Sequence, residues 1–321
     1  MKKRSRVVLL IIIIAVLAFA IYVLVYDFPG PVADLFAPDT TEAVAEPEDP
    51  EDPENAGSGS GPDTEIDTDG ISSLWFDNRL NKDRYAAFAA RMPETDLADI
   101  VWMVEANLDL QPYSGSEPVV DPESITALVN KFFYLEEDFS PPTIVEIDSS
   151  MLRKEAADAV DQLINVAAVG GFRLWVQSGY RSFTVQKTLY ENYSASDGQE
   201  TADTYSARPG HSEHQLGLAV DFNTITDAFG ESPEGRWVAD NSWQFGYIMR
   251  YTKENTEITQ FRPEPWHFRY IGKERAAHFK DIKMTSYEEY WVKYIKYQPP
   301  GFELPGESED EAEEEEVTEE G

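Results

Sequence analysis

The chain has 321 residues, no cysteine, and 60 acidic against 26 basic residues, which gives a formal net charge of −34. That length allows one or two domains with a buried core. The lack of cysteine excludes disulfide scaffolds, thiolate metal sites and cysteine nucleophiles, so a metal ion would have to be bound by His, Asp or Glu. The acidic charge argues against nucleic-acid binding, which requires a basic surface.

The negative charge is concentrated in two segments that flank the predicted folded region. Residues 27–73 carry 14 acids and no Lys or Arg, and residues 307–321 carry 10 acids and no base. Residues 74–306 keep 36 acids and 22 bases, a net charge of −14. The folded part of the chain is therefore expected between residues 74 and 306.

An apolar block follows the basic segment 1–6. Residues 7–26 read VVLLIIIIAVLAFAIYVLVY, 20 residues without a charge, and at about 1.5 Å per residue such a helix spans about 30 Å of hydrocarbon. We interpret it as an uncleaved transmembrane helix, with the basic segment cytoplasmic and the rest of the chain outside. The alternative is a signal peptide cleaved at Ala18-Phe19-Ala20, but apolar residues continue past that site.

The two acidic segments are predicted to be disordered. Residues 27–73 contain EPEDPEDPEN and GSGSGP and few aromatics, so they cannot bury enough apolar surface to fold. We interpret them as a tether with an end-to-end distance of about 40 Å. Residues 307–321 are interpreted as a solvated acidic tail.

Apolar spacing predicts three helices in the first part of the folded region. They are 97–108 behind Thr95 as N-cap, 152–167 behind Ser149 or Ser150 and ended by Gly170-Gly171, and 182–193 capped by Ser182. Short β-rich runs then predict strands at 172–176, 218–222, 247–250 and 266–270, with a further helix near 233–245. This mixture indicates an α+β fold in which helices pack against a small, largely antiparallel sheet.

Possible catalytic chemistry is concentrated in two short segments that contain histidine. In the first, His214 leads through a Gly turn into a strand that ends on Asp221, and in the second Glu264 precedes His267 by three residues. Two His and one Asp leave zinc a fourth position for water, as in catalytic sites, and bound zinc lowers the pKa of that water toward about 7. Glu264 is then the candidate general base. The alternative is that both histidines are structural.

Three motifs in order resemble those of the VanY-type D-alanyl-D-alanine carboxypeptidases. They are Ser178-Gly179-Tyr180-Arg181-Ser182, Ser212-x-His214-x-x-Gly217-x-Ala219-x-Asp221 and Glu264-x-Trp266-His267-x-Arg269-Tyr270. The resemblance covers about Leu128, where Leu-Val-Asn-Lys opens it, to about Tyr294. It implies a single catalytic domain at 128–306 with the hedgehog/D-Ala-D-Ala peptidase-like fold, and a helical N-terminal extension at 74–127.

The resemblance also implies roles for individual residues. One zinc ion per chain would be held by His214, Asp221 and His267, with Glu264 as catalytic base. Substrate would be contacted by Arg181, Gln186 and Ser212, while Tyr180 and Trp266 shape the pocket. Arg181 is a permanently charged donor fork, suited to a terminal carboxylate or to the oxyanion of the reaction. His211 is interpreted as pocket rim or hydrogen-bond partner, and His278 as structural.

These features predict a membrane-anchored zinc carboxypeptidase that removes the C-terminal D-alanine from peptidoglycan stem peptides outside a bacterial cell membrane. No obligate protein partner is predicted. The alternatives are an L,D-carboxypeptidase that acts on the tetrapeptide stem and a catalytically silent wall-binding module. His and Asp also suit manganese, iron or cobalt.

Overall fold

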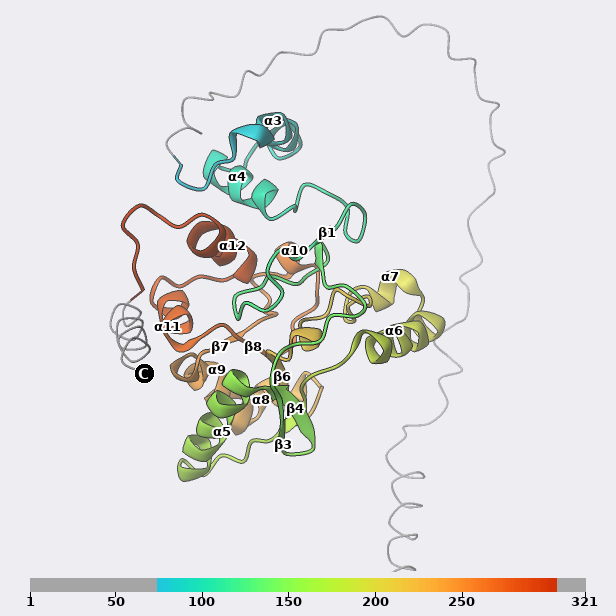
Figure 1. The fold of residues 1–321 in the computed structure, drawn as a ribbon, viewed down its shortest axis with the longest axis vertical. Coiled ribbons are helices and arrows are strands. Elements are labelled where there is room, and N and C mark those ends of the chain that lie inside the picture. Colours follow the sequence, from blue (N-terminus) through green and yellow to red (C-terminus); the bar gives the residue numbers. More distant parts are fainter. Residues whose placement is uncertain (1–73, 305–321) are drawn as a thin grey trace, which may run out of the picture. The chain divides into compact units, whose positions relative to one another are not determined.

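The structure is a computed structural model that describes residues 74–304 (Figure 1). The predicted segments 1–6, 7–26, 27–73 and 307–321 lie outside the described residues. Among residues 74–304, no helix has the length and apolarity needed to cross a membrane.

A four-stranded antiparallel sheet lies at the centre of the fold, which confirms the predicted sheet type. Its strands, in spatial order, are β5 (Val176–Ser178), β6 (Ala219–Phe222), β8 (His267–Tyr270) and β7 (Tyr247–Met249). The prediction of a strand at 172–176 was wrong by several residues. The side chain of Asn223 bonds the backbone of Arg173 and Trp175, so these residues are not in the ladder.

The register of β6 and β8 determines which side chains lie together. Asp221 is directly opposite His267, and Val220 is opposite Phe268. Because side chains alternate between the two faces of a sheet, Asp221 and His267 share one face. Val220 and Phe268 lie on the other face, where both are fully buried in the main hydrophobic core.

The main core is closed by α5 (Lys154–Val169), which presents its apolar stripe to the sheet. Ser149 or Ser150 was predicted to cap this helix, and this was wrong, because Arg153 precedes its first residue. Ser150 begins strand β4 (Ser150–Arg153), which pairs with β3 (Ile144–Ile147) in a hairpin. The hairpin turns at Asp148, whose φ is 53°, and the positive φ is typical of two-residue hairpin loops.

Helix α6 (Phe183–Asp197) begins behind Ser182, whose Oγ accepts a hydrogen bond from Val185 N at 3.4 Å. The predicted cap is therefore confirmed, although the helix continues four residues beyond Tyr193. The later helical segments are α7 (Gln199–Ala202), η3 (Glu213–Leu216), α8 (Ala228–Glu231), α9 (Pro233–Asn241), η4 (Ser242–Phe245), α10 (Thr256–Thr259), α11 (Lys273–Asp281), α12 (Tyr287–Trp291) and η5 (Val292–Lys296). The predicted helix near 233–245 is thus confirmed as α9 followed by η4.

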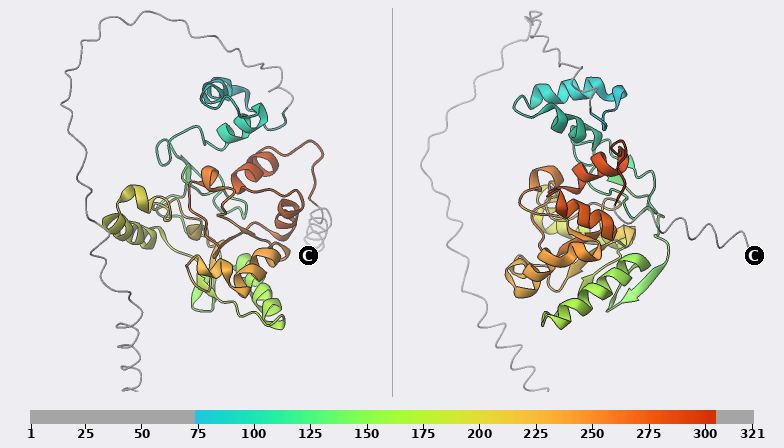
Figure 2. Two further views of the ribbon diagram at one scale, coloured as in Figure 1. Left: turned by 180° about the vertical axis from the view of Figure 1, so that it is seen from behind. Right: turned by 90° about the vertical axis from the view of Figure 1, so that its left-hand side faces the viewer.

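The N-terminal helices lie at the opposite end of the described structure from α5 and the β3–β4 hairpin (Figures 1 and 2). They are η2 (Arg79–Asn81), α3 (Lys82–Arg91) and α4 (Leu97–Glu105), and they share a hydrophobic cluster with Val292. Asp96, not the predicted Thr95, precedes α4, and the helix ends before Leu108. Residues 106–127 hold one short strand, β1 (Glu117–Pro118), which pairs in parallel with β2 (Phe133–Tyr134), so the extension is helical only in its first half.

Candidate active site

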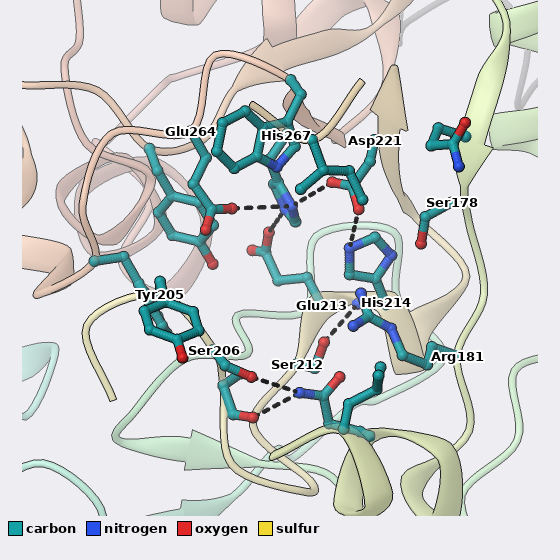
Figure 3. A pocket seen from close by; sticks show the side chains of 18 of the residues that line it. Ser178, Arg181, Tyr205, Ser206, Ser212, Glu213, His214, Asp221, Glu264 and His267 are labelled. Carbon is teal, nitrogen blue, oxygen red and sulfur yellow. Dashed lines mark hydrogen bonds and ion pairs between the residues drawn. The ribbon is translucent and has the colours of Figure 1, made fainter. Parts of the chain in front are cut away.

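A pocket of about 730 Å³ opens beside the ends of β6 and β8. Its walls come from the loop between β5 and α6, from η3, and from residues 205–207 and 261–264. In Figure 3 the side chains of His214, Asp221, Glu264 and His267 point toward one another in this pocket. Segments far apart in the sequence therefore supply one site.

His214, Asp221 and His267 form the ligand cluster of this pocket. Asp221 lies between the two imidazoles, with Oδ1 3.1 Å from His267 Nδ1 and Oδ2 3.3 Å from His214 Nε2. One ligand atom from each residue lies within 4.8 Å of the other two, and all three residues are buried. A tetrahedral zinc ion with bonds of about 2.0 Å holds its ligand atoms about 3.3 Å apart. The donor set and spacing therefore fit zinc.

Each imidazole of the ligand cluster is held from outside by its second nitrogen. His214 Nδ1 lies 2.6 Å from the carbonyl oxygen of Gly179, and His267 Nε2 lies 3.3 Å from Glu213 Oε2. A Cβ on Gly179 would come within 2.3 Å of the Met151 carbonyl oxygen, so only glycine fits there. Such outer contacts fix the orientation of metal-binding histidines.

Glu264 lies next to the ligand cluster without belonging to it. Its Oε2 is 3.8 Å from His267 Nδ1, and only 8% of the residue is exposed. Burial raises the pKa of Glu264 to about 7. A carboxyl group with such a pKa accepts and returns a proton near neutral pH, which suits a general base.

The two histidines of the ligand cluster respond differently to their surroundings, since burial and the Arg181 charge lower the pKa of His214. Burial opposes the ionised forms, but hydrogen bonds with Asp221 and Glu213 raise the pKa of His267 to about 9. The two histidines hold the pKa of the Asp221 carboxyl well below its usual range despite burial. The Asp221 carboxyl is thus ionised between the two imidazoles, which is the form that binds a divalent cation.

The structure also places the predicted substrate residues in this pocket. Arg181, Ser212 and Gln186 line it, together with Tyr180 and Trp266. Among the described residues, the Arg181 guanidinium has no carboxylate within ion-pair distance, and burial lowers its pKa. It is therefore available to an anionic group in the pocket.

Gln186 is the one buried residue of α6. Its Nε2 donates to the Ala207 carbonyl oxygen at 2.6 Å, which fixes the orientation of the amide. Its Oε1 is buried and has no hydrogen-bond partner. A buried carbonyl without a partner is costly, so Oε1 is suited to accept an N–H from a ligand.

The other two histidines lie outside this cluster. His211 Nδ1 bonds the Asn130 carbonyl oxygen at 2.8 Å, and the residue is not part of the pocket lining, so it is a hydrogen-bond partner and not a rim residue. His278 lies in α11 and contacts the Tyr290 hydroxyl at 3.1 Å, in agreement with a structural role.

Glu213 was not among the predicted site residues. Its side chain is fully buried between Arg250, Arg269 and His267. Despite the burial, Arg250 and Arg269 hold the pKa of this carboxyl well below its usual range. The signal in the sequence was weak: Glu213 is an acid that directly precedes His214, and the residues that follow, from Leu216 to Val220, are apolar.

Comparisons with known proteins agree with this site. The family model described as "VanY: D-alanyl-D-alanine carboxypeptidase" matches residues 149–273. The putative carboxypeptidase YodJ of Bacillus subtilis is 38% identical over 204 residues, which cover 59% of this chain and 74% of that protein. A D-alanyl-D-alanine carboxypeptidase of Enterococcus faecium is 36% identical over 152 residues, 47% of each chain. The solved LD-carboxypeptidase LdcB has a TM-score of 0.53 and 38% identity, covering 56% of this chain and 91% of its own.

Proposed function

Since this chain belongs to the VanY family of D-alanyl-D-alanine carboxypeptidases, we propose that it is a zinc-dependent carboxypeptidase that removes the C-terminal D-alanine from peptidoglycan stem peptides. The observation that carries this proposal is the ligand cluster of His214, Asp221 and His267 with Glu264 beside it. A silent binding module would not require a base at that place.

The proposed reaction is hydrolysis of the last peptide bond. Zinc held by the ligand cluster would supply a polarised water and a Lewis acid for the scissile carbonyl. Glu264 accepts the proton of the attacking water and delivers it to the amine of D-alanine as the C–N bond breaks. The Arg181 guanidinium stabilises the negative charge that develops on the carbonyl oxygen.

Substrate orientation would depend on three polar side chains of the pocket wall. Gln186 Oε1 would accept an N–H of the peptide, since its amide is fixed by the Ala207 carbonyl. Ser212 lies in the same wall and offers its hydroxyl. Together with Arg181 these residues would hold the last two residues of the substrate over Glu264.

The direct test is the release of D-alanine by the full chain, purified in detergent. We expect release from a pentapeptide stem that ends in D-Ala-D-Ala, loss of release after treatment with a zinc chelator, and recovery on addition of zinc. Intact zinc binding without any release from pentapeptide or tetrapeptide would favour a silent wall-binding module and refute the proposal.

A second candidate activity is L,D-carboxypeptidase action on the tetrapeptide stem. It is supported by the similarity to LdcB, at 38% identity over 91% of that chain. The family model and the Enterococcus relative carry the D-alanyl-D-alanine name instead, which is why we place D,D-activity first. The ratio of kcat/KM for the pentapeptide and the tetrapeptide distinguishes the two.

Our proposal includes attachment to the membrane through residues 7–26. It is supported by 20 uncharged apolar residues behind a basic segment. In a bacterial host, the full chain should stay in the membrane fraction after alkaline extraction, and its C-terminus should be open to protease added to spheroplasts. A chain lacking residues 7–26 should leave the membrane fraction. Release of the full chain by alkaline extraction would contradict the anchor.

A further inference from the structure

Glu213 is a fully buried carboxylate that the proposed reaction does not use. It lies in η3, directly before the ligand His214 in the sequence, yet its side chain contacts the other ligand histidine, His267. Its side chain has no exposed surface. A buried charge is costly unless it is paired, so its surroundings decide what it does.

The two oxygens of Glu213 have different partners. Oε1 accepts hydrogen bonds from Arg250 Nε at 2.9 Å and from Arg269 Nη1 at 3.0 Å. Both guanidiniums are themselves fully buried. Oε2 is left for His267 Nε2, at 3.3 Å (Figure 3). The arginines thus fix the carboxylate so that one oxygen faces the imidazole.

The surrounding network is balanced in charge. Arg250 makes two further hydrogen bonds with Glu288, of 2.6 and 3.1 Å, and Arg269 donates to the carbonyl oxygens of Ile125 and Ala127. Two arginines therefore face two glutamates, Glu213 and Glu288. Glu288 pairs with Arg250, as Glu213 does. Among the described residues, the hydrogen-bond partners of the His267 ring are Asp221 and Glu213, not Glu288.

The contact with Glu213 determines which nitrogen of His267 faces the pocket. A carboxylate only accepts hydrogen bonds, so Nε2 must carry a proton to donate to it. Nδ1 lies 3.1 Å from Asp221 Oδ1, which also only accepts, so both nitrogens face carboxylates. If a cation bound to Asp221 took the place of the proton on Nδ1, the lone pair of Nδ1 would point to that cation while Nε2–H stayed on Glu213. His214 is presented in the opposite way, through Nε2, because its Nδ1 faces the Gly179 carbonyl.

We propose that Glu213 is a positioning residue that holds His267 in the tautomer and orientation needed to bind the cation through Nδ1. This inference rests on the proposed function, because it assigns a role toward the metal ion. Glu213 would thus act on the metal site from outside the three ligands, a role that sequence spacing did not indicate.

Glu213→Gln changes the donor pattern without changing the size of the side chain. The arginines are donors only, so the amide oxygen must face them and the NH₂ group must face His267 Nε2. That nitrogen then has to accept, and the proton moves to Nδ1, where it blocks metal binding. Loss of such an outer contact lowers metal affinity by about 10- to 100-fold.

Glu288→Gln is the matched control, since it removes a carboxylate from the same buried network away from His267. Zinc affinity is measured by competition with a chromophoric chelator on the full-length chain in detergent. We expect the Glu213 variant to lose zinc affinity by the stated factor and the Glu288 variant to keep that of the wild type. Equal losses in both variants, or none in the Glu213 variant, would overturn the proposal.

A second measurement does not depend on the fold of a variant. Spectra of zinc-saturated wild-type chain labelled with ¹⁵N-histidine should show His267 protonated at Nε2, and protonation at Nδ1 would overturn the proposal. If the wild type bound no zinc, the proposed function would fail. Zinc binding without release of D-alanine would overturn the proposed function and leave the inference to the spectrum, so the two failures are distinguishable.

Discussion

At the scale of single residues, the backbone of Gly179 and the side chain of Glu213 act on the ligand histidines from outside the cluster. Both residues lie inside the motifs, Gly179 two positions before Arg181 and Glu213 directly before His214. The motif therefore contains groups that bind and groups that orient. Substitutions can separate the two roles.

Gly179→Ala should weaken metal binding without removing a ligand. The added Cβ would come within 2.3 Å of the Met151 carbonyl oxygen, so the backbone must move and carry with it the carbonyl that faces His214 Nδ1. We expect zinc affinity to fall by about tenfold or more. The control is Gly171→Ala at the end of α5, where no atom lies within 4 Å of the added Cβ.

Gly171 has a φ of 84°, so the control variant carries backbone strain of about 1 kcal/mol away from the pocket. It should therefore lose some stability and keep its zinc affinity. A Gly179 variant with wild-type zinc affinity would show that the Gly179 carbonyl does not orient His214.

Glu264→Gln should abolish proton transfer and leave the ligand cluster intact. The amide cannot accept the proton of the attacking water, so kcat should fall by about 10²- to 10⁴-fold. Zinc affinity should stay close to that of the wild type, because Glu264 is not one of the three ligands. Steady-state release of D-alanine and chelator competition measure the two quantities, and a variant with full activity would refute the assignment of the base.

At the scale of elements, Lys131 joins two loops that form the pocket wall. Its Nζ donates to the carbonyl oxygens of Asp203 and Gln260, each at 2.7 Å, and lies 4.2 Å above the Phe261 ring. Tyr205 and Phe261, from the same two loops, line the pocket. Burial lowers the pKa of Lys131 to about 8.

Lys131→Met should raise KM, because the two loops that carry Tyr205 and Phe261 lose the side chain that joins them. It should also remove a pH dependence of the free energy of unfolding. In the wild type the folded pKa of about 8 lies below the ordinary value of 10.5, so between these values the unfolded chain binds more protons and the free energy of unfolding rises with pH. Below pH 8 this group contributes no slope. The Met variant should lack the rise when unfolding is followed by urea titration at several pH values.

Lys154→Met serves as the control for this experiment. Lys154 pairs with Asp158 on the exposed surface of α5, where no buried ammonium group is involved. Its variant should keep both the KM and the rise of stability with pH. An unchanged pH profile in the Lys131 variant would mean that another group titrates there.

At the scale of the whole molecule, Glu105 joins the N-terminal helices to the C-terminal end of the described chain. Its Oε1 accepts from Tyr85 and Asn81, and its Oε2 accepts from Lys296 and Tyr297 at 2.8 and 2.6 Å. These four hydrogen bonds to one buried carboxylate, together with a small hydrophobic cluster, attach the helices η2, α3 and α4 to the rest of the described chain.

Glu105→Ala should therefore destabilise the protein by about 3 kcal/mol, since four donors lose their acceptor and one of them, the Tyr85 hydroxyl, is buried. Zinc affinity should not change, because neither Glu105 nor the N-terminal helices line the pocket. Thermal and urea unfolding measure the loss. Asp158→Ala, which removes an exposed pair on α5, should cost at most about 0.5 kcal/mol, and equal effects of the two variants would contradict the role of Glu105.

By itself, the sequence determined the α+β class, the capped start of α6, and three of the four central strands to within one residue. Its motifs also identified the three ligand residues, Glu264 and the predicted substrate residues that the structure brings together in the pocket, but not Glu213. Periodicity, turn residues and caps act over a few positions, so they can be recognised locally. The start of α5 was predicted wrongly because Ser150 has two competing local uses, and its pairing with Ile147 in the β3–β4 hairpin prevails.

Only the tertiary structure decided that Asp221 lies opposite His267 and that Glu213 reaches the same imidazole. These contacts join residues 46 and 54 positions apart, and strand register and buried ion pairs depend on the packing of the whole domain. Arg250 and Arg269 were not recognisable as partners of Glu213 for the same reason. A buried charge needs partners from several elements, and only folding brings those elements together.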